Sequence, residues 1–257
     1  MKVVNTLAKL GPDCILHLSP DEIRFINEFE LAQGSQAFCT LKKEALFDDY
    51  LIESAAANNI GFSLKLENLE KALKSAIAFG SRAEARLIKK KGQALLSITL
   101  SNAAKGSQLD QDIPIELVSQ VASRQPPEAP EPLVHIVLPP LKQLRTVIER
   151  MKQLADHLTI KANMDGMLIV EIDTDFVHVS TTYCNLPHFQ LADRPLVRDP
   201  TIQAEVKVDI KKFSRFLAST QIAPTNTICC LTPGHSLFIH VSVADLVLNY
   251  YLSVISL

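Results

Sequence analysis

The sequence predicts an α+β fold of two similar domains, each with an antiparallel sheet and two helices on one face of it. Three observations support this prediction. Helical and strand-like segments follow one another in the same order in the two halves of the 257 residues. Four segments carry apolar residues at helical spacing on one side only. A stretch with four prolines and no apolar period, 119–132, is typical of an extended connector. We therefore expect domains at 1–118 and 133–257.

The first half begins with a helix over residues 2–10, which Gly11 and Pro12 end. Alternating apolar residues between turn signals then predict four strands, at 14–19, 23–29, 37–42 and 60–66. The last of these runs directly into a second helix, for which Asn68 is the expected N-cap. A hairpin that turns at residues 90–92 and a closing strand at 109–117 complete the half.

The second half repeats this order. A strand at 133–138 leads into a helix over 140–155, and a strand at 205–210 leads into a fourth helix. Between these helices lie three predicted strands and a long polar loop, at 157–163, 168–173, 176–183 and 184–202. A hairpin and a final strand end the chain, at 226–232, 236–241 and 246–255. Because the order of elements is the same, the halves are interpreted as a duplication.

The four helices concentrate positive charge away from their apolar faces. The chain as a whole is slightly acidic, with 26 Lys and Arg against 28 Asp and Glu. The cations off the apolar faces are Lys2, Lys9, Lys71, Lys74, Lys142, Arg145, Lys152, Lys211, Lys212 and Arg215. Such residues are often only a solvated helix face, because Lys and Arg favour helices. The same bias on four helices favours instead a surface that follows a duplex phosphate backbone without reading its sequence.

Catalytic, metal and cofactor sites are not supported. The seven histidines form no HExxH motif and no zinc-ligand spacing with cysteine. No phosphate-binding GxxxxGK[ST] motif and no GxSxG motif is present. Asp173 and Asp175 alternate near a strand end, but such a pair is more often a solvated turn than an acid–base pair. We expect no catalytic residue, no metal and no cofactor.

The cysteines and the apolar runs bear on the cellular setting. Five cysteines, an odd number with no CxxC spacing, indicate reduced thiols in an intracellular protein. No apolar run reaches the ~20 residues that a membrane-spanning helix needs, so no membrane partner is expected.

Five motifs carry a family resemblance. They are DIPIEL (112–117), the long segment 138–166, VSTTY (179–183), VDIKKFSRFLASTQIAPT (208–225) and LVLNYYL (246–252). With the duplicated domain, the proline-rich connector and the basic helices, they resemble the DNA sliding clamps related to proliferating cell nuclear antigen. Within these the chain is similar to the Hus family of the heterotrimeric checkpoint clamp. In that family a strand precedes the first helix, whereas Met1 begins at the helix here. We therefore expect domain one to lack its first strand, which leaves unpaired groups at a sheet edge.

The resemblance implies a non-enzymatic subunit of a ring that encircles DNA at damage sites and serves as a platform for checkpoint signalling and repair. It implies these partners: two other clamp-like subunits, double-stranded DNA, a clamp loader, and checkpoint and repair proteins. It implies a nuclear location, and a cytoplasmic one for the unassembled chain. Subunits would join through two sheet edges by strand addition. The edge residues are Asp110, Asp112, Ile113, Ile115, Leu117, Val177, Val179, Thr181 and Tyr183.

Two other functions stay open from the residues alone. A replicative processivity clamp has the same fold but forms a homotrimer, so self-association would favour it. An α+β enzyme of small molecules would need an apolar pocket with convergent acid and base groups, which the sequence does not indicate.

Overall fold

The computed structural model describes residues 1–29, 34–79, 82–102, 106–119, 121, 124–128, 130–187, 199–219 and 226–255. Contacts divide the chain into two compact units. Unit 1 comprises Met1–Asn27 and Thr40–Gln125, and unit 2 comprises Glu28–Cys39 and Pro126–Leu257.

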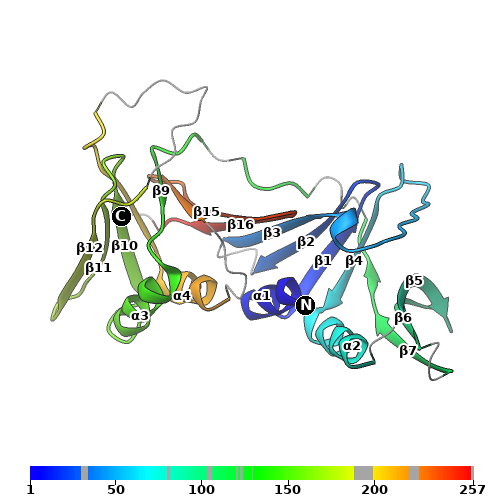
Figure 1. The fold of residues 1–257 in the computed structure, drawn as a ribbon. Helices are drawn as coiled ribbons and strands as arrows, with labels where there is room; N and C mark the ends of the chain where they lie inside the picture. Colours follow the sequence, from blue (N-terminus) through cyan, green and yellow to red (C-terminus); the bar gives the residue numbers. More distant parts are fainter. Residues whose placement is uncertain are drawn as a thin grey trace. The chain divides into compact units, whose positions relative to one another are not determined.

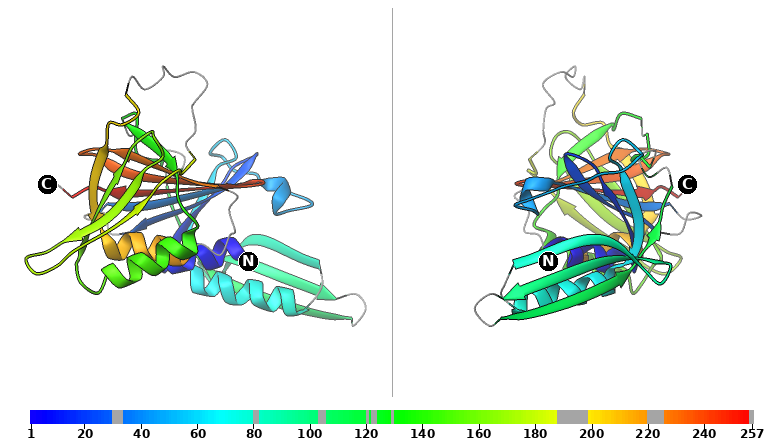
Figure 2. Two further views of the ribbon diagram at one scale, coloured as in Figure 1. Left: turned by 60° about the vertical axis from the view of Figure 1, so that its left-hand side comes forward. Right: turned by 90° about the vertical axis from the view of Figure 1, so that its right-hand side faces the viewer.

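Unit 1 holds two helices and two groups of antiparallel strands (Figure 1). Its elements are α1 (Lys2–Leu10), β1 (Asp13–Leu18), β2 (Glu22–Phe29, which begins here), η1 (Lys43–Ala45), β4 (Ile60–Lys65), α2 (Leu66–Phe79), β5 (Arg82–Lys90), β6 (Gln93–Asn102), β7 (Ser107–Pro114) and β8 (Glu116–Leu117). Four strands lie in the order β8-β4-β1-β2, and three form a separate sheet in the order β5-β6-β7. Figure 2 shows this three-stranded sheet alongside α2.

Unit 2 also holds two helices and two groups of antiparallel strands. They are β3 (Ser35–Lys42, which ends in unit 1), β9 (Val134–Val137), α3 (Leu141–Met151), β10 (His157–Ala162), β11 (Leu168–Asp173), β12 (His178–Tyr183), β13 (Ala204–Asp209), α4 (Ile210–Ser219), β14 (Asn226–Thr232), β15 (Ser236–Val243) and β16 (Leu246–Ser253). The strand orders are β3-β16-β15-β14-β9 and β12-β11-β10-β13. The predicted α+β class, with two helices and antiparallel sheets in each half, is confirmed.

The amphipathic patterns explain why these segments are helices and strands. In α1 the residues at helical spacing, Val4, Leu7 and Leu10, are buried. In β11 alternate residues are buried, because one face of the strand covers the core and the other meets solvent. The hairpin between β5 and β6 turns in two residues, Lys91 and Gly92, which both have positive φ, as a type I′ turn requires.

Strand β3 divides the chain differently from the predicted domain 1–118. Residues 35–39 belong to unit 2, where β3 is the neighbour of β16. The backbone N–H of Ser253 donates to the carbonyl oxygen of Gly34 at 2.9 Å. The rings of Phe38 and Tyr251 meet edge to face, with centroids 5.9 Å apart. The pairing partner of a strand is a long-range property, so the order of elements alone could not reveal it.

The predicted connector, 119–132, contains one buried side chain. Val121 is 4% exposed and packs where Gly61 has no side chain. A Cβ atom on Gly61 would lie 2.4 Å from the Cβ of Val121, so a larger residue at that position would displace the segment. The predicted connector, which has no apolar period, therefore still contributes this one valine to the packing of unit 1. The contact-based boundary lies inside the segment, between Gln125 and Pro126.

Helix boundaries also differ slightly from those expected. Helix α2 begins at Leu66, so Asn68 lies inside the helix and is not its N-cap. Helix α3 ends at Met151, and Leu154 beyond it is 52% exposed, although the pattern placed it on the buried face. The predicted loop 184–202 lies partly outside the described residues.

The expected open sheet edge in the first half is found at β5. Its counterpart in unit 2 is β14, which pairs with β15 on one side and with β9 on the other. Among the described residues β5 pairs with β6 alone. Leu87 on β5 is 37% exposed, whereas Leu231 on β14 is fully buried.

Because of this difference in burial, replacing leucine by alanine should lower the free energy of unfolding by unequal amounts at the two positions. Leu231→Ala should lower the free energy of unfolding by about 2–5 kcal/mol, because it leaves a cavity between packed strands. Leu87→Ala should lower it by less than about 1 kcal/mol, because the side chain is partly exposed and has a neighbouring strand on one side only. Urea unfolding curves of the two variants measure both costs. Equal losses would show that the β5 edge is covered.

Candidate nucleic-acid interface and sheet edges

Each unit presents a pair of packed helices. Helix α1 packs against α2 in unit 1, and α3 packs against α4 in unit 2, where Figure 1 shows the two side by side. The buried side of α3 is formed by Leu144, Ile148 and Met151. The buried side of α4 includes Phe213 and Phe216. The positive residues of both pairs therefore fall on the remaining, outward surface.

The predicted cations differ in exposure. All of them are exposed except Lys152 and Lys212, which are half-buried. The exposed ones are Lys2, Lys9, Lys71, Lys74, Lys142, Arg145, Lys211 and Arg215. Exposure on the outward surface of a helix pair is what a phosphate-contacting side chain needs.

Several of these cations already have a carboxylate partner. Lys71 pairs with Glu67 at 2.5 Å and Lys74 with Glu70 at 2.6 Å, each one turn apart on α2. Lys211 pairs with Asp156 at 2.7 Å, and this ammonium holds the pKa of Asp156 below its usual value. Exposed pairs of this kind contribute little stability, but the carboxylate cancels part of the attraction to phosphate.

Four cations make no ion pair within the described part of the chain: Lys2, Lys142, Arg145 and Arg215. Lys142 and Arg145 lie one turn apart on α3, and Arg215 lies on α4, which packs against α3. Because no carboxylate oxygen of the described residues lies within ion-pair distance of them, although Glu149 is close enough to Arg145 to interact with it, these three give the helix pair of unit 2 its strongest attraction for a polyanion.

Lys152 holds the two helices of unit 2 together. Its Nζ lies 2.6 Å from Glu149 Oε2 and donates to Ser214 Oγ at 3.1 Å. Ser214 Oγ in turn donates to Glu149 Oε1 at 2.6 Å, and Ser214 is 2% exposed. A lysine held in this way has fewer donors left for phosphate, so the structure gives Lys152 a packing role. Sequence spacing could not show this, because Ser214 is far from Lys152 along the chain.

The network makes the stability of unit 2 depend on pH. Hydrogen bonds from Lys152 and Ser214 hold the pKa of Glu149 below its usual value of 4.5. A lowered pKa in the folded state means that the carboxylate stabilises the fold above the unfolded pKa. That contribution is lost as the pH falls below about 4.5 and through the folded pKa.

We therefore expect Glu149→Gln to lose less stability than the parent chain between neutral pH and pH ~3. The difference should stay below about 1 kcal/mol, because the side chains are partly exposed. Thermal melts across this range measure it, with the exposed Glu44→Gln as the matched control. If the melting temperatures of the parent and of Glu149→Gln fall in parallel as the pH is lowered, the network does not make the stability depend on pH.

Two sheet edges are open where the family resemblance places subunit contacts. Among the described residues β7 pairs with β6 alone and β12 pairs with β11 alone. On β12, Val179, Thr181 and Tyr183 lie on the core-facing side, opposite buried residues of β11, yet each is only half-buried. Half-buried core-facing side chains are expected where a sheet ends without a covering strand.

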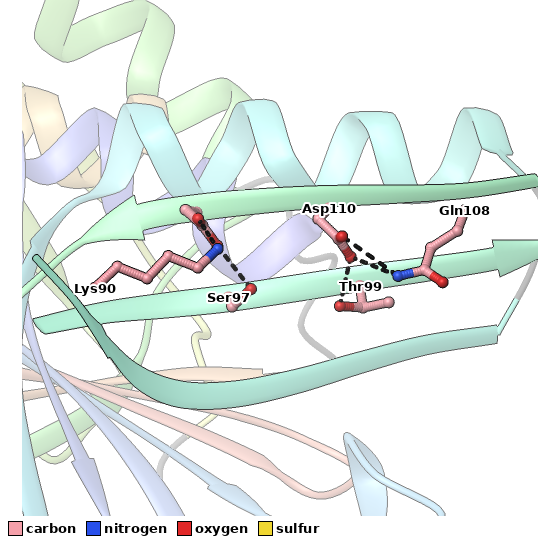
Figure 3. A network of polar contacts seen from close by, with 6 residues as sticks. Lys90, Ser97, Thr99, Gln108 and Asp110 are labelled. Atoms are coloured by element: carbon pink, nitrogen blue, oxygen red, sulfur yellow. Dashed lines mark hydrogen bonds and ion pairs between the residues drawn. The ribbon is translucent and has the colours of Figure 1, made fainter.

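The acidic residues of β7 are engaged on the face of their sheet. Asp112 accepts hydrogen bonds from Lys90 at 2.6 Å and Ser97 at 2.7 Å, and Asp110 accepts from Thr99 at 2.8 Å and Gln108 at 3.1 Å (Figure 3). These bonds lower the pKa of both carboxyl groups. The network fixes β7 on β6, and it occupies the side chains of the two aspartates.

The other predicted residues of this edge are placed differently. Ile113 and Ile115 are 3% and 7% exposed, so their side chains pack in the core, and the backbone N–H of Ile115 already donates to the carbonyl oxygen of Ala94 at 3.2 Å. The predicted strand 109–117 is in fact two, because Leu117 lies in β8 and pairs with Phe62 of β4. Two features of the sequence mark the boundary between these strands. They are Pro114, which has no backbone N–H to donate to a neighbouring strand, and the alternation of buried residues.

Two exposed residues were missed by the sequence analysis. Arg150 is exposed in the last turn of α3, where a cation also complements the helix dipole. Phe176 is 94% exposed in the turn between β11 and β12. The prediction placed it at the start of a strand, whereas β12 begins at His178. The turn-forming residues directly before it, Thr174 and Asp175, were the available signal.

The described residues contain no group of three or more His, Cys, Asp or Glu that could hold a metal ion. They also contain no helix with the length and apolar character of a membrane span.

The geometry can be set beside known proteins. The family model described as Hus1-like protein matches residues 1–256. The chain is 38% identical over 258 residues to "Checkpoint protein hus1 homolog" of Dictyostelium discoideum, covering 99% of this chain and 94% of that protein. It is 33% identical over 267 residues to human "Checkpoint protein HUS1", covering 99% and 94%.

Solved structures share the fold. Proliferating cellular nuclear antigen from Entamoeba histolytica matches with a TM-score of 0.72 at 16% identity, covering 99% of this chain and 94% of that one. The PCNA of Thermococcus kodakaraensis matches with a TM-score of 0.69 at 17% identity, covering 99% and 95%. The two-domain clamp fold expected from the sequence is therefore confirmed.

Proposed function

The chain belongs to the Hus1-like protein family, and on that premise we propose that it is a non-enzymatic subunit of a ring-shaped DNA-damage checkpoint clamp. The observation that carries the proposal is the family match over residues 1–256, together with the clamp fold. The relatives named above are checkpoint proteins, which favours this function over a homotrimeric replicative clamp and over an enzyme.

The helix pairs support contact with DNA. Lys142, Arg145 and Arg215 present long flexible cations that make no ion pair among the described residues. Such side chains contact phosphates wherever the duplex lies, and they carry no sequence information. Weak, sequence-independent attraction suits a ring that must slide, because enclosure rather than affinity keeps it on the duplex.

The open edges support assembly. Strands β7 and β12 each offer one unpaired side, and strand addition there would give backbone hydrogen bonds to two neighbours. Each subunit thus uses one edge of unit 1 and one edge of unit 2, which is the arrangement that closes a ring. The proposed neighbours are two different clamp-like chains, with a loader to open the ring and checkpoint and repair proteins as further partners.

The proposed place of action is the nucleus, with unassembled chain in the cytoplasm. There the clamp would mark damaged DNA and act as a platform for checkpoint signalling and repair.

Retention on DNA of different topology tests this function. The chain, its two partner chains and the loader are incubated with nicked circular DNA and washed with high salt. We expect the complex to stay on the circle and to leave when a restriction enzyme linearises it. Equal loss from circular and linear DNA would contradict enclosure.

A further inference from the structure

The turn that connects β11 to β12 is held rigidly. The backbone N–H of Thr174 donates to the carbonyl oxygen of Val177 at 3.1 Å, and Thr174 Oγ1 donates to the same oxygen at 3.0 Å. The backbone N–H of Val177 donates to Thr174 Oγ1 at 3.0 Å. Three hydrogen bonds close a turn of four residues, so the two residues at its tip have a fixed position.

Phe176 stands at this tip and is 94% exposed, the highest value among the large apolar residues of the described chain. Val177 beside it is 38% exposed. A full phenyl ring in water is unfavourable, so burying it against another protein would stabilise the contact. Because the turn is already ordered, little further conformational entropy would be lost when the ring is buried against another protein.

The strand that follows is the open edge of its sheet. Figure 1 shows β12 as the outermost strand of the sheet in unit 2. The last ladder pair before the turn joins Asp173 to His178, so Phe176 lies just beyond the N-terminal end of β12. An incoming strand on this edge would therefore meet the phenyl ring at one of its ends.

The direction of the incoming strand decides which end that is. All the strand pairs with a described register in this chain are antiparallel, including β10–β11 and β11–β12. A strand that continues this sheet in antiparallel fashion would place its C-terminal end beside His178. The residues that meet Phe176 are then those that follow the partner's edge strand.

We propose that Phe176 is the anchor by which the clamp subunit seated on β12 docks, inserting its ring into an apolar pocket formed by the partner residues that follow that subunit's edge strand. The proposal rests on the proposed ring function. It gives the two sides of this chain different chemistry. The β12 side offers an exposed aromatic ring on a closed turn, whereas the β7 side offers the hydrogen-bonded Asp110 and Asp112 with exposed apolar side chains that are aliphatic, Leu109 and Leu117. Two different partners, one for each side, fit this asymmetry.

The test measures binding of the parent chain and of Phe176→Ala to each of the two partner chains separately, by biolayer interferometry. We expect Phe176→Ala to bind one partner at least roughly tenfold more weakly, as for an anchor residue, and to bind the other unchanged. Phe176→Leu should lose less, because it keeps an apolar side chain. The matched control is Thr182→Ala, an exposed residue on the opposite face of the same strand, which should bind both partners as the parent does.

Each other outcome overturns the proposal. Unchanged binding of Phe176→Ala to both partners would show that Phe176 is not an anchor, while the proposed clamp assembly would stand. Weaker binding to both, with an unchanged melting temperature, would show that the residue does not distinguish the sides. If Phe176→Ala instead lost self-association, the protein that covers the phenyl ring would be a second copy of this chain. Failure of the parent chain to bind either partner would contradict the proposed function itself, and the anchor with it.

Discussion

Replacing Lys142, Arg145 and Arg215 together by alanine should weaken duplex binding by the assembled ring and lower its salt dependence. Each phosphate contact adds about 0.9 to the slope of log K against log salt, so three lost contacts should reduce the slope by roughly 2.7. The three side chains are exposed and make no ion pair among the described residues, so the change should leave the fold intact. Fluorescence anisotropy at several salt concentrations measures the slope.

A triple variant of unit 1 is the matched control. Lys65, Lys89 and Lys91 are also exposed and make no ion pair among the described residues, and replacing them removes the same charge. If affinity depends on where the cations lie, the control should change the slope by less than one contact. If the slope of the variant that lacks Lys142, Arg145 and Arg215 equals that of the parent, these three residues do not face DNA.

Phe216→Ala should lower the stability of unit 2 by about 3–5 kcal/mol. Phe216 is fully buried on α4 and stacks on Tyr250, with ring centroids 5.1 Å apart. Tyr250 is itself 1% exposed, and its hydroxyl donates to the carbonyl oxygen of Lys212 at 3.3 Å. Removing the ring leaves a cavity between the helix and β16, and Tyr250 loses its stacking partner.

Hydrogen exchange measures this effect better than a single melting temperature, because it reports opening element by element. Amides of α4 and β16 should exchange faster in Phe216→Ala, while those of α1 and β1 stay protected. Phe176→Ala serves as the control, since an exposed ring has no packing to lose. Protection of α4 equal to that of the parent would show that the core tolerates the cavity.

The sequence predicted the helices and hairpins well, since these depend on local patterns. The apolar period placed α1 at the observed residues, and the strand pattern placed β10, β11 and β14. The period could not show which partner a strand chooses. Strand β3 lies next to β16, more than two hundred residues away along the chain, and so falls in unit 2 with it.

The candidate site was predicted in part for the same reason. Residue type and helical spacing were enough to find exposed cations such as Arg145 and Arg215. They could not show that Lys152 is tied to Ser214, because that contact joins two helices. Nor could alternation alone separate the buried Ile113 from the exposed residues of the same strand, since this depends on where α2 lies.

The mass of the native particle tests the central claim most directly, namely that this chain is one of three different subunits of a ring. Mass photometry is carried out on the chain alone and on its mixture with the two candidate partner chains. We predict no homotrimer from the chain alone and a 1:1:1 complex from the mixture. A stable homotrimer of this chain, or a mixture that contains only separate chains, would contradict the claim.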